Sequence, residues 1–143
     1  MKIAAIIFGI VFLLLGIAGF TGMASEGSVF GLEVGAVHNV VHLLTGIIAL
    51  WVAFVGVGAV RKFFKIFGVI YLIVAILGFF TDGKILGLIE NNSADAWFHL
   101  IVAVLALVLG FSSKKASVPA MTQPAAAPMQ QPPMGGPQDQ QGQ

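Results

Sequence analysis

Hydrophobic positions divide the chain into four long apolar runs, which cover residues 3–23, 37–60, 63–81 and 94–111. The hydrocarbon core of a bilayer needs about 20 apolar residues in helical conformation, at about 1.5 Å per residue. Because an isolated apolar strand would leave its backbone groups without hydrogen bonds in lipid, each run is predicted to be a helix. The predicted fold class is all-α, a polytopic membrane protein with four transmembrane helices.

The C-terminal segment has a different pattern. All six prolines and all glutamines lie at or after Pro119, and bulky aliphatic residues are almost absent there. Such a segment cannot bury enough apolar surface to offset the entropy of ordering it. We therefore expect a transmembrane domain over residues 1–113 and a disordered Pro/Gln-rich cytoplasmic tail over residues 114–143. A solvated tail is the simpler interpretation, and contact with a cytoplasmic partner is the alternative.

Composition supports a membrane location and excludes several classes. The chain of 143 residues is 58% hydrophobic and 9% charged, whereas a soluble domain has about 25% charged residues. Because there is no cysteine, catalytic thiols, disulfides and thiolate metal sites are excluded. A net charge of +1 gives no electrostatic basis for a nucleic-acid partner. The expected partner is the lipid bilayer.

Basic residues predict the orientation of the chain, because lysine and arginine concentrate on the cytoplasmic side of a membrane. Six of the seven lie before the first run, between the second and third, or after the fourth, while the acidic residues of the other two connections lie on the opposite side. The prediction is a multi-pass protein of the plasma (inner) membrane with both termini in the cytoplasm. The six are Lys2, Arg61, Lys62, Lys65, Lys114 and Lys115.

The two halves of the chain resemble each other. Residues 8–13, FGIVFL, align with residues 67–72, FGVIYL, and residues 38–43, HNVVHL, align with residues 95–100, DAWFHL. Each half consists of a helix, an outer loop and a second helix. The half therefore starts and ends on the same side of the membrane. Two such halves would be related by an axis along the membrane normal. We therefore expect a four-helix bundle built as two repeated helical hairpins.

A polar stripe marks the outer ends of the second and fourth helices. His38, His42 and Thr45 share one helical face, and Asp95 and His99 do the same on the fourth run. His42 and His99 fall about one turn inside the bilayer, where a polar side chain is costly without a partner. Asp95 is positioned to accept the ring N–H of His99.

Three interpretations of these residues compete. The first, which is favoured, is a structural hydrogen-bond network that includes Asn39 and Thr45, because membrane helices use polar side chains to pair. The second is a divalent metal site, in which three imidazoles and one carboxylate complete the coordination. Its ligands would be His38, His42, Asp95 and His99. The third is haem with His42 and His99 as axial ligands, although no outer arginine is present to meet the propionates.

No catalytic machinery is visible in the sequence. It has no nucleophile–base pair, phosphate loop or dinucleotide fingerprint. We expect no enzymatic activity and no cofactor, and predict a structural or interaction module of the membrane. The alternative is a metal- or ion-binding protein, or a small transporter component, that uses the His/Asp cluster. The first helix has a smooth face at Gly16, Gly19 and Gly22. Packing within the bundle is its favoured purpose, and association with a second copy or another membrane protein is the alternative.

Two short motifs carry a family resemblance. Asn39, His42 and Leu43 form an Asn-x-x-His-Leu segment that opens the second run, and Asp95, His99 and Leu100 are spaced similarly in the fourth. The chain resembles the small bacterial membrane proteins catalogued as domain of unknown function 4383, in which the second motif reads Asp-Asn-x-x-His-Leu. Ala96 replaces that asparagine here. The resemblance covers about residues 3–111 and implies a four-helix membrane domain without an established activity.

Overall fold

Four helices make up most of the protein, as predicted. The computed structural model describes residues 1–21, 27–81 and 83–112, so the predicted disordered tail at 114–143 lies outside the described residues. Each helix is long and apolar enough to cross a membrane, which confirms the all-α prediction. The helices are α1 (Lys2–Phe20), α2 (Ala36–Val55), α3 (Val57–Phe80) and α4 (Ser93–Phe111).

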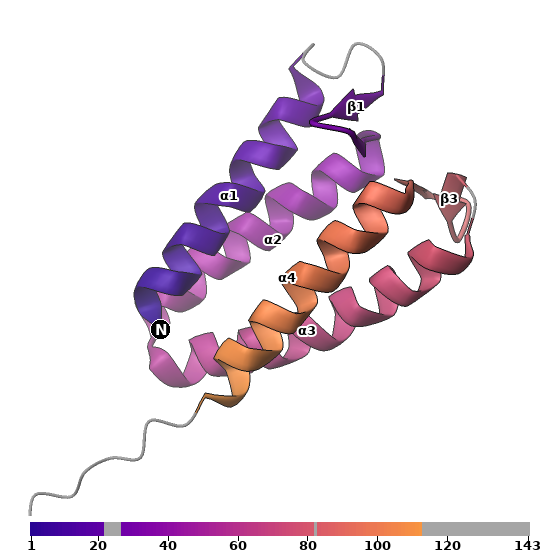
Figure 1. Ribbon diagram of the computed structural model, residues 1–143. Helices are drawn as coiled ribbons and strands as arrows, with labels where there is room; N and C mark the ends of the chain where they lie inside the picture. The colour runs from indigo at the N-terminus through magenta and orange to yellow at the C-terminus, as the bar shows by residue number, and fades with distance from the viewer. Residues whose placement is uncertain (22–26, 82, 113–143) are drawn as a thin grey trace, which may run out of the picture. The chain divides into compact units, whose positions relative to one another are not determined.

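The helices pack as two hairpins. α1 lies along α2, and α3 lies along α4, while the contacts between the two pairs are fewer (Figure 1). The N-terminus and the α2–α3 turn lie at one end of the bundle, which we call the basic end because it carries Lys2, Arg61 and Lys62. Both outer connections lie at the other end, which we call the hairpin end.

Outward-facing side chains of the bundle are apolar along its whole length. Each helix leaves large hydrophobic residues half or more exposed, among them Ile7, Trp51, Ile73 and Ile101. A soluble monomer rarely exposes apolar surface on this scale, because water makes it unfavourable. In a bilayer the same surface is solvated by acyl chains, so the exposure agrees with four membrane-spanning helices.

The turn between α2 and α3 is tighter than the sequence predicted. α2 ends at Val55, and α3 begins at Val57 rather than near residue 63. Gly56 alone joins them, with φ +148° and ψ 169°, a backbone conformation that is open essentially only to glycine. As a result Arg61 and Lys62 belong to the first turns of α3.

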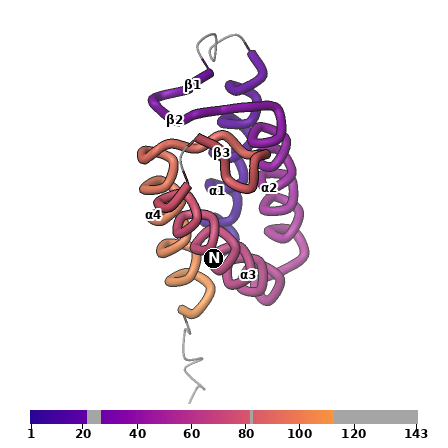
Figure 2. The backbone as a smooth tube through the Cα atoms, turned by 90° about the vertical axis from the view of Figure 1, so that its right-hand side faces the viewer, coloured from indigo at the N-terminus to yellow at the C-terminus, as the bar shows by residue number. Residues whose placement is uncertain are grey.

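Each outer connection forms a short antiparallel β-hairpin, which the sequence analysis did not predict. Strand β1 (Ser28–Val29) pairs with β2 (Leu32–Glu33), and β3 (Gly83–Ile85) pairs with β4 (Ile89–Asn91). The hairpins lie side by side, since β2 contacts β4, as Figure 2 shows from a view turned by 90°. They cover the hairpin end of the bundle and hold the starts of α2 and α4 together.

The turns of the two hairpins use the same backbone conformation. Phe30 and Gly31 both have positive φ, at 54° and 82°, and Leu86 and Gly87 follow with 53° and 71°. A bulky residue in the left-handed region costs about 1–2 kcal/mol. The paired strands must offset that cost, and the tips leave Phe30 and Leu86 exposed.

Aromatic rings join the two helix pairs at the centre of the bundle. Phe8 of α1 meets Phe67 of α3 edge to face at 4.8 Å between ring centroids. One turn nearer the hairpin end, Phe12 meets Tyr71 in the same way at 5.7 Å. Such edge-to-face pairs add about 0.5–1.5 kcal/mol beyond the burial of their area.

Within each helix pair, glycine permits the closest approach. A methyl group added at Gly68 of α3 would lie 2.7 Å from Leu107 Cγ of α4 and 3.0 Å from the Leu107 backbone nitrogen. One added at Gly9 of α1 would lie 2.8 Å from Leu50 Cγ of α2. Close packing of this kind is a main source of helix association in lipid, where the hydrophobic effect does not act.

Replacing Gly68 therefore tests the packing of α3 on α4. We expect Gly68→Ala to lower the free energy of unfolding by about 1–2 kcal/mol, because the added methyl forces the helices apart. Gly58→Ala is the matched control: it lies on the same helix, and a methyl group there meets nothing within 4 Å. Thermal unfolding in detergent micelles measures both. Equal melting temperatures for the two variants would contradict the packing assigned to Gly68.

Candidate metal centre

Two histidines project from the first turns of α2 at the hairpin end. His38 and His42 lie one helical turn apart, with ring centroids separated by 4.4 Å. Each side chain is only 2% exposed. The i, i+4 spacing places both imidazoles on the same face of the helix, toward the interior of the bundle.

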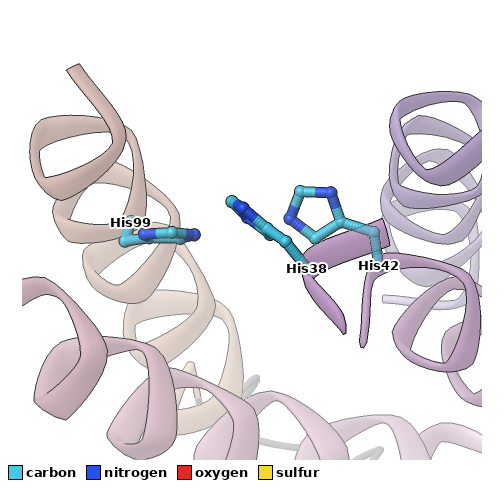
Figure 3. Close-up of side chains that lie close together, drawn as sticks. All are labelled: His38, His42 and His99. Carbon is cyan, nitrogen blue, oxygen red and sulfur yellow. The ribbon is translucent and has the colours of Figure 1, made fainter. Parts of the chain in front are cut away.

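The third histidine reaches the same place from the other helix pair. His99 lies in the second turn of α4, is 3% exposed, and has its ring 5.7 Å from that of His38. Figure 3 shows the three rings converging, with His38 between the other two. One nitrogen from each ring lies within 4.8 Å of the others. We call His38, His42 and His99 the histidine cluster.

The nitrogens of the histidine cluster are buried and largely without partners. Both ring nitrogens of His38, both of His42 and Nδ1 of His99 have no hydrogen-bond partner among the described residues. The backbones of Glu33 and Glu90 lie close to the His38 ring, but not in hydrogen-bonding geometry. Each buried unsatisfied polar atom costs about 1–3 kcal/mol. A group of five therefore requires an explanation.

Aromatic side chains hold two of the imidazoles from the interior side. Phe12 meets the His42 ring edge to face at 5.2 Å and 84°, and Tyr71 meets the His99 ring at 5.3 Å and 75°. Thr45, one turn deeper than His42 on α2, interacts with Tyr71. These contacts fix the ring planes without using the ring nitrogens, which stay available to a ligand.

Asp95, the predicted carboxylate of this site, forms a helix cap instead. Its Oδ2 accepts hydrogen bonds from the backbone nitrogens of Glu33, at 2.9 Å, and Asn92, at 3.0 Å. Its own backbone nitrogen donates to Asn92 Oδ1 at 3.0 Å, which completes a capping box at the start of α4. Among the described residues no hydrogen bond joins Asp95 to His99. The carboxylate still lies close enough to His38 to interact with it electrostatically.

The third residue of the helix therefore has different roles in α2 and in α4. It is Asp95 in α4, after the N-cap Asn92, and His38 in α2, after the N-cap Gly35. Gly35 has no side chain to cap the helix, and imidazole at His38 does not accept from the backbone. The His38 ring is consequently free to face the other two imidazoles.

A carboxylate from the second hairpin takes the place beside the N-cap of α2. The Glu90 side chain occupies the space where Gly35 would carry a Cβ, and it pairs with Lys84 at 3.2 Å. Its own backbone N–H, which lies close to the carboxylate, and the Lys84 ammonium lower the pKa of Glu90. Glu90 is therefore ionised at neutral pH, at the positive end of the α2 dipole and near the histidine cluster.

Asn39, predicted to support His42, packs in another direction. Its amide lies against Gly19 of α1, where even a methyl group would overlap it. At the matching place in the other helix pair, Ala96 Cβ would lie 3.1 Å from a methyl at Gly78, and Asn91 fills the remaining space. Asn91 Nδ2 also donates to the Gly78 carbonyl at 3.0 Å. Asn91 thus supplies the amide that Ala96 lacks.

Fold and site together define a four-helix protein of membrane-spanning type with a buried histidine cluster at one end. The chain belongs to the family described as Domain of unknown function (DUF4383), whose profile matches residues 2–112. The resemblance seen in the His-Leu motifs is thereby confirmed. No curated protein and no solved structure matches the chain.

Removing the Asp95 carboxylate tests its capping role. We expect Asp95→Ala to lower the free energy of unfolding by about 1–3 kcal/mol, because the backbone N–H groups of Glu33 and Asn92 lose their acceptor. Ser93→Ala is the control, since Ser93 is exposed and its side chain makes no hydrogen bond among the described residues. Thermal unfolding in detergent compares them. An Asp95→Ala variant with the melting temperature of the wild type would contradict the capping role.

Proposed function

We propose that this protein binds a divalent transition-metal ion at the hairpin end of the bundle, with His38, His42 and His99 as ligands. The observation that carries the proposal is the convergence of three buried imidazoles, five of whose six nitrogens have no hydrogen-bond partner among the described residues. A metal ion would satisfy one nitrogen on each ring at once. The proposed function is therefore metal binding within the membrane, without catalysis.

The spacing of the nitrogens suits a metal ion. Three atoms no more than 4.8 Å apart lie within about 2.8 Å of a common centre, and zinc–imidazole bonds are about 2.0–2.1 Å long. Each nitrogen would need to move by less than about 1 Å, which small side-chain rotations supply. Imidazole ligands suit Zn, Cu, Fe and Ni, and a three-histidine set leaves a fourth position for water or a substrate.

Carboxylates around the cluster would compensate the charge of the ion. A divalent cation bound by three neutral imidazoles keeps two positive charges, which are costly in a low-dielectric setting. Asp95 and Glu90 both lie close enough to His38 to interact with it electrostatically. Asp95, which caps α4, and Glu90, beside the N-cap of α2, would thus lower the cost of holding the ion.

The structural alternative receives less support from these contacts. A hydrogen-bond network would satisfy its own members, yet neither nitrogen of His42 has a partner among the described residues. Haem is disfavoured because the His38 ring lies 4.4 Å from that of His42 and 5.7 Å from that of His99, in the space a porphyrin would need. Metal binding accounts for one nitrogen on each of the three rings, and neither of the other two interpretations does so for all three.

Charge distribution supports placing the metal centre on the outer side of the inner membrane. Lys2, Arg61 and Lys62 lie at the basic end, and the described acidic residues, Glu33, Glu90 and Asp95, lie at the hairpin end. By the positive-inside rule the basic end faces the cytoplasm, with both termini. The ion would then be taken from, or presented to, the extracytoplasmic side.

We also infer that the two helix pairs derive from one repeated hairpin. Phe12 packs on His42 as Tyr71 packs on His99, at nearly the same distance and angle. The alignment of the two halves pairs position 38 (His38) with position 95 (Asp95). One position would thus have diverged into a metal ligand in one half and a helix cap in the other.

Metal analysis of purified protein tests the proposal. After loading with Zn²⁺, Cu²⁺ or Ni²⁺ in detergent and exhaustive dialysis, we expect about one ion of a single metal per chain by mass spectrometry. His42→Gln and His99→Gln should lose it, because glutamine keeps the polarity but not the imidazole. Tyr71→Phe is the control, since it keeps the ring against His99 and changes no ligand.

Two results would overturn metal binding. One is wild-type protein that retains no ion from any of the three loadings. The other is a retained ion whose amount is unchanged in both histidine variants, which would place it elsewhere in the chain. Circular dichroism of each variant shows whether a loss of metal merely reflects a loss of the fold.

A further inference from the structure

We propose that the protein also binds an anionic phospholipid in the groove between α2 and α3, with the headgroup at the basic end. The groove has a volume of about 480 Å³, and none of the three histidines of the cluster lines it. Its walls are apolar side chains, with one charged residue, Lys62. Because Ile48, Ile66 and Ile70 line it and are half-exposed, the groove opens toward the surrounding lipid.

The length of the groove matches one leaflet. On α3 its lining extends from Ala59 to Tyr71, which corresponds to about 18 Å at 1.5 Å per residue. Half of the hydrocarbon core of a bilayer is about 15 Å. A single acyl chain of a lipid in the leaflet at the basic end would therefore run along the groove toward Thr45 and Tyr71.

Charge at the mouth of the groove selects the headgroup. Lys62 is exposed and forms no ion pair among the described residues. The acidic residues that the structure describes all lie at the hairpin end. Lys65, three residues further, instead lies over the Phe111 ring at 4.6 Å. Arg61 has a buried Nε without a partner among the described residues. A phosphate at the mouth would meet Lys62, with Arg61 next to it in the chain, as basic pockets between membrane helices do.

A second groove provides an internal comparison. It lies between α1 and α4, has a volume of about 470 Å³ and includes Val11 and Ile101 in its lining. No charged residue lines it. Lipid chains should fill both grooves, but only the α2–α3 groove should distinguish an anionic headgroup from a zwitterionic one.

Lipid titration followed by native mass spectrometry tests this site. The detergent-solubilised full chain is titrated with dioleoyl phosphatidylglycerol or dioleoyl phosphatidylcholine. We expect the first phosphatidylglycerol to bind about fivefold more tightly, the effect of about one lysine charge near a headgroup. Lys62→Gln should remove the preference, and Ile66→Trp should remove the binding by filling the groove. Ile101→Trp, which fills the other groove, should leave the preference intact.

Other outcomes would overturn the site. Equal affinity for the two lipids, or a preference that survives Lys62→Gln and Ile66→Trp, would show that this groove does not recognise the anionic headgroup. A dimer that excludes lipid and dissociates in Ile66→Trp would assign the groove to a second copy. The titration is independent of metal binding, because His42→Gln should keep the lipid preference whether or not it holds an ion.

Discussion

The central physical constraint is that a polar nitrogen buried in a low-dielectric interior needs a partner. At the hairpin end, five ring nitrogens of the histidine cluster lack one among the described residues. The surrounding structure supplies no partner to them: Phe12 and Tyr71 make near-perpendicular ring contacts, and Asp95 accepts from two backbone N–H groups. A shared metal ion is the simplest group that satisfies three imidazoles together.

Much of the architecture could be predicted from the sequence because lipid imposes simple rules. The four helices follow from apolar runs of spanning length. The i, i+4 spacing of His38 and His42 placed both on one face, and the alignment of His42 with His99 placed a third imidazole at similar depth. The structure brings these three together. The helices and the face that each histidine shares could therefore be predicted, because both follow from local periodicity.

The remainder depends on contacts between distant residues. The turns of the β-hairpins are formed by Phe30-Gly31 and Leu86-Gly87. Neither is the Asn-Gly or Asp-Gly pair that predicts a tight turn from sequence. Asp95 was assigned to the metal site because its spacing to His99 was right. The Asn92–Asp95 pair was itself a capping signal, but the bond from Glu33, 62 residues away, was not visible. The place of Glu90 beside Gly35 likewise depends on how the two hairpins meet.

X-ray absorption spectroscopy of the metal-loaded protein in lipid nanodiscs tests the central claim most directly, because it reports the atoms bound to the ion. The account predicts about three imidazole nitrogens at about 2.0–2.1 Å, with the multiple-scattering pattern of histidine rings. His99→Gln, loaded and dialysed in the same way, should retain no ion and give no imidazole-coordinated metal signal. A first shell of oxygen or methionine sulfur without imidazole scattering would contradict it.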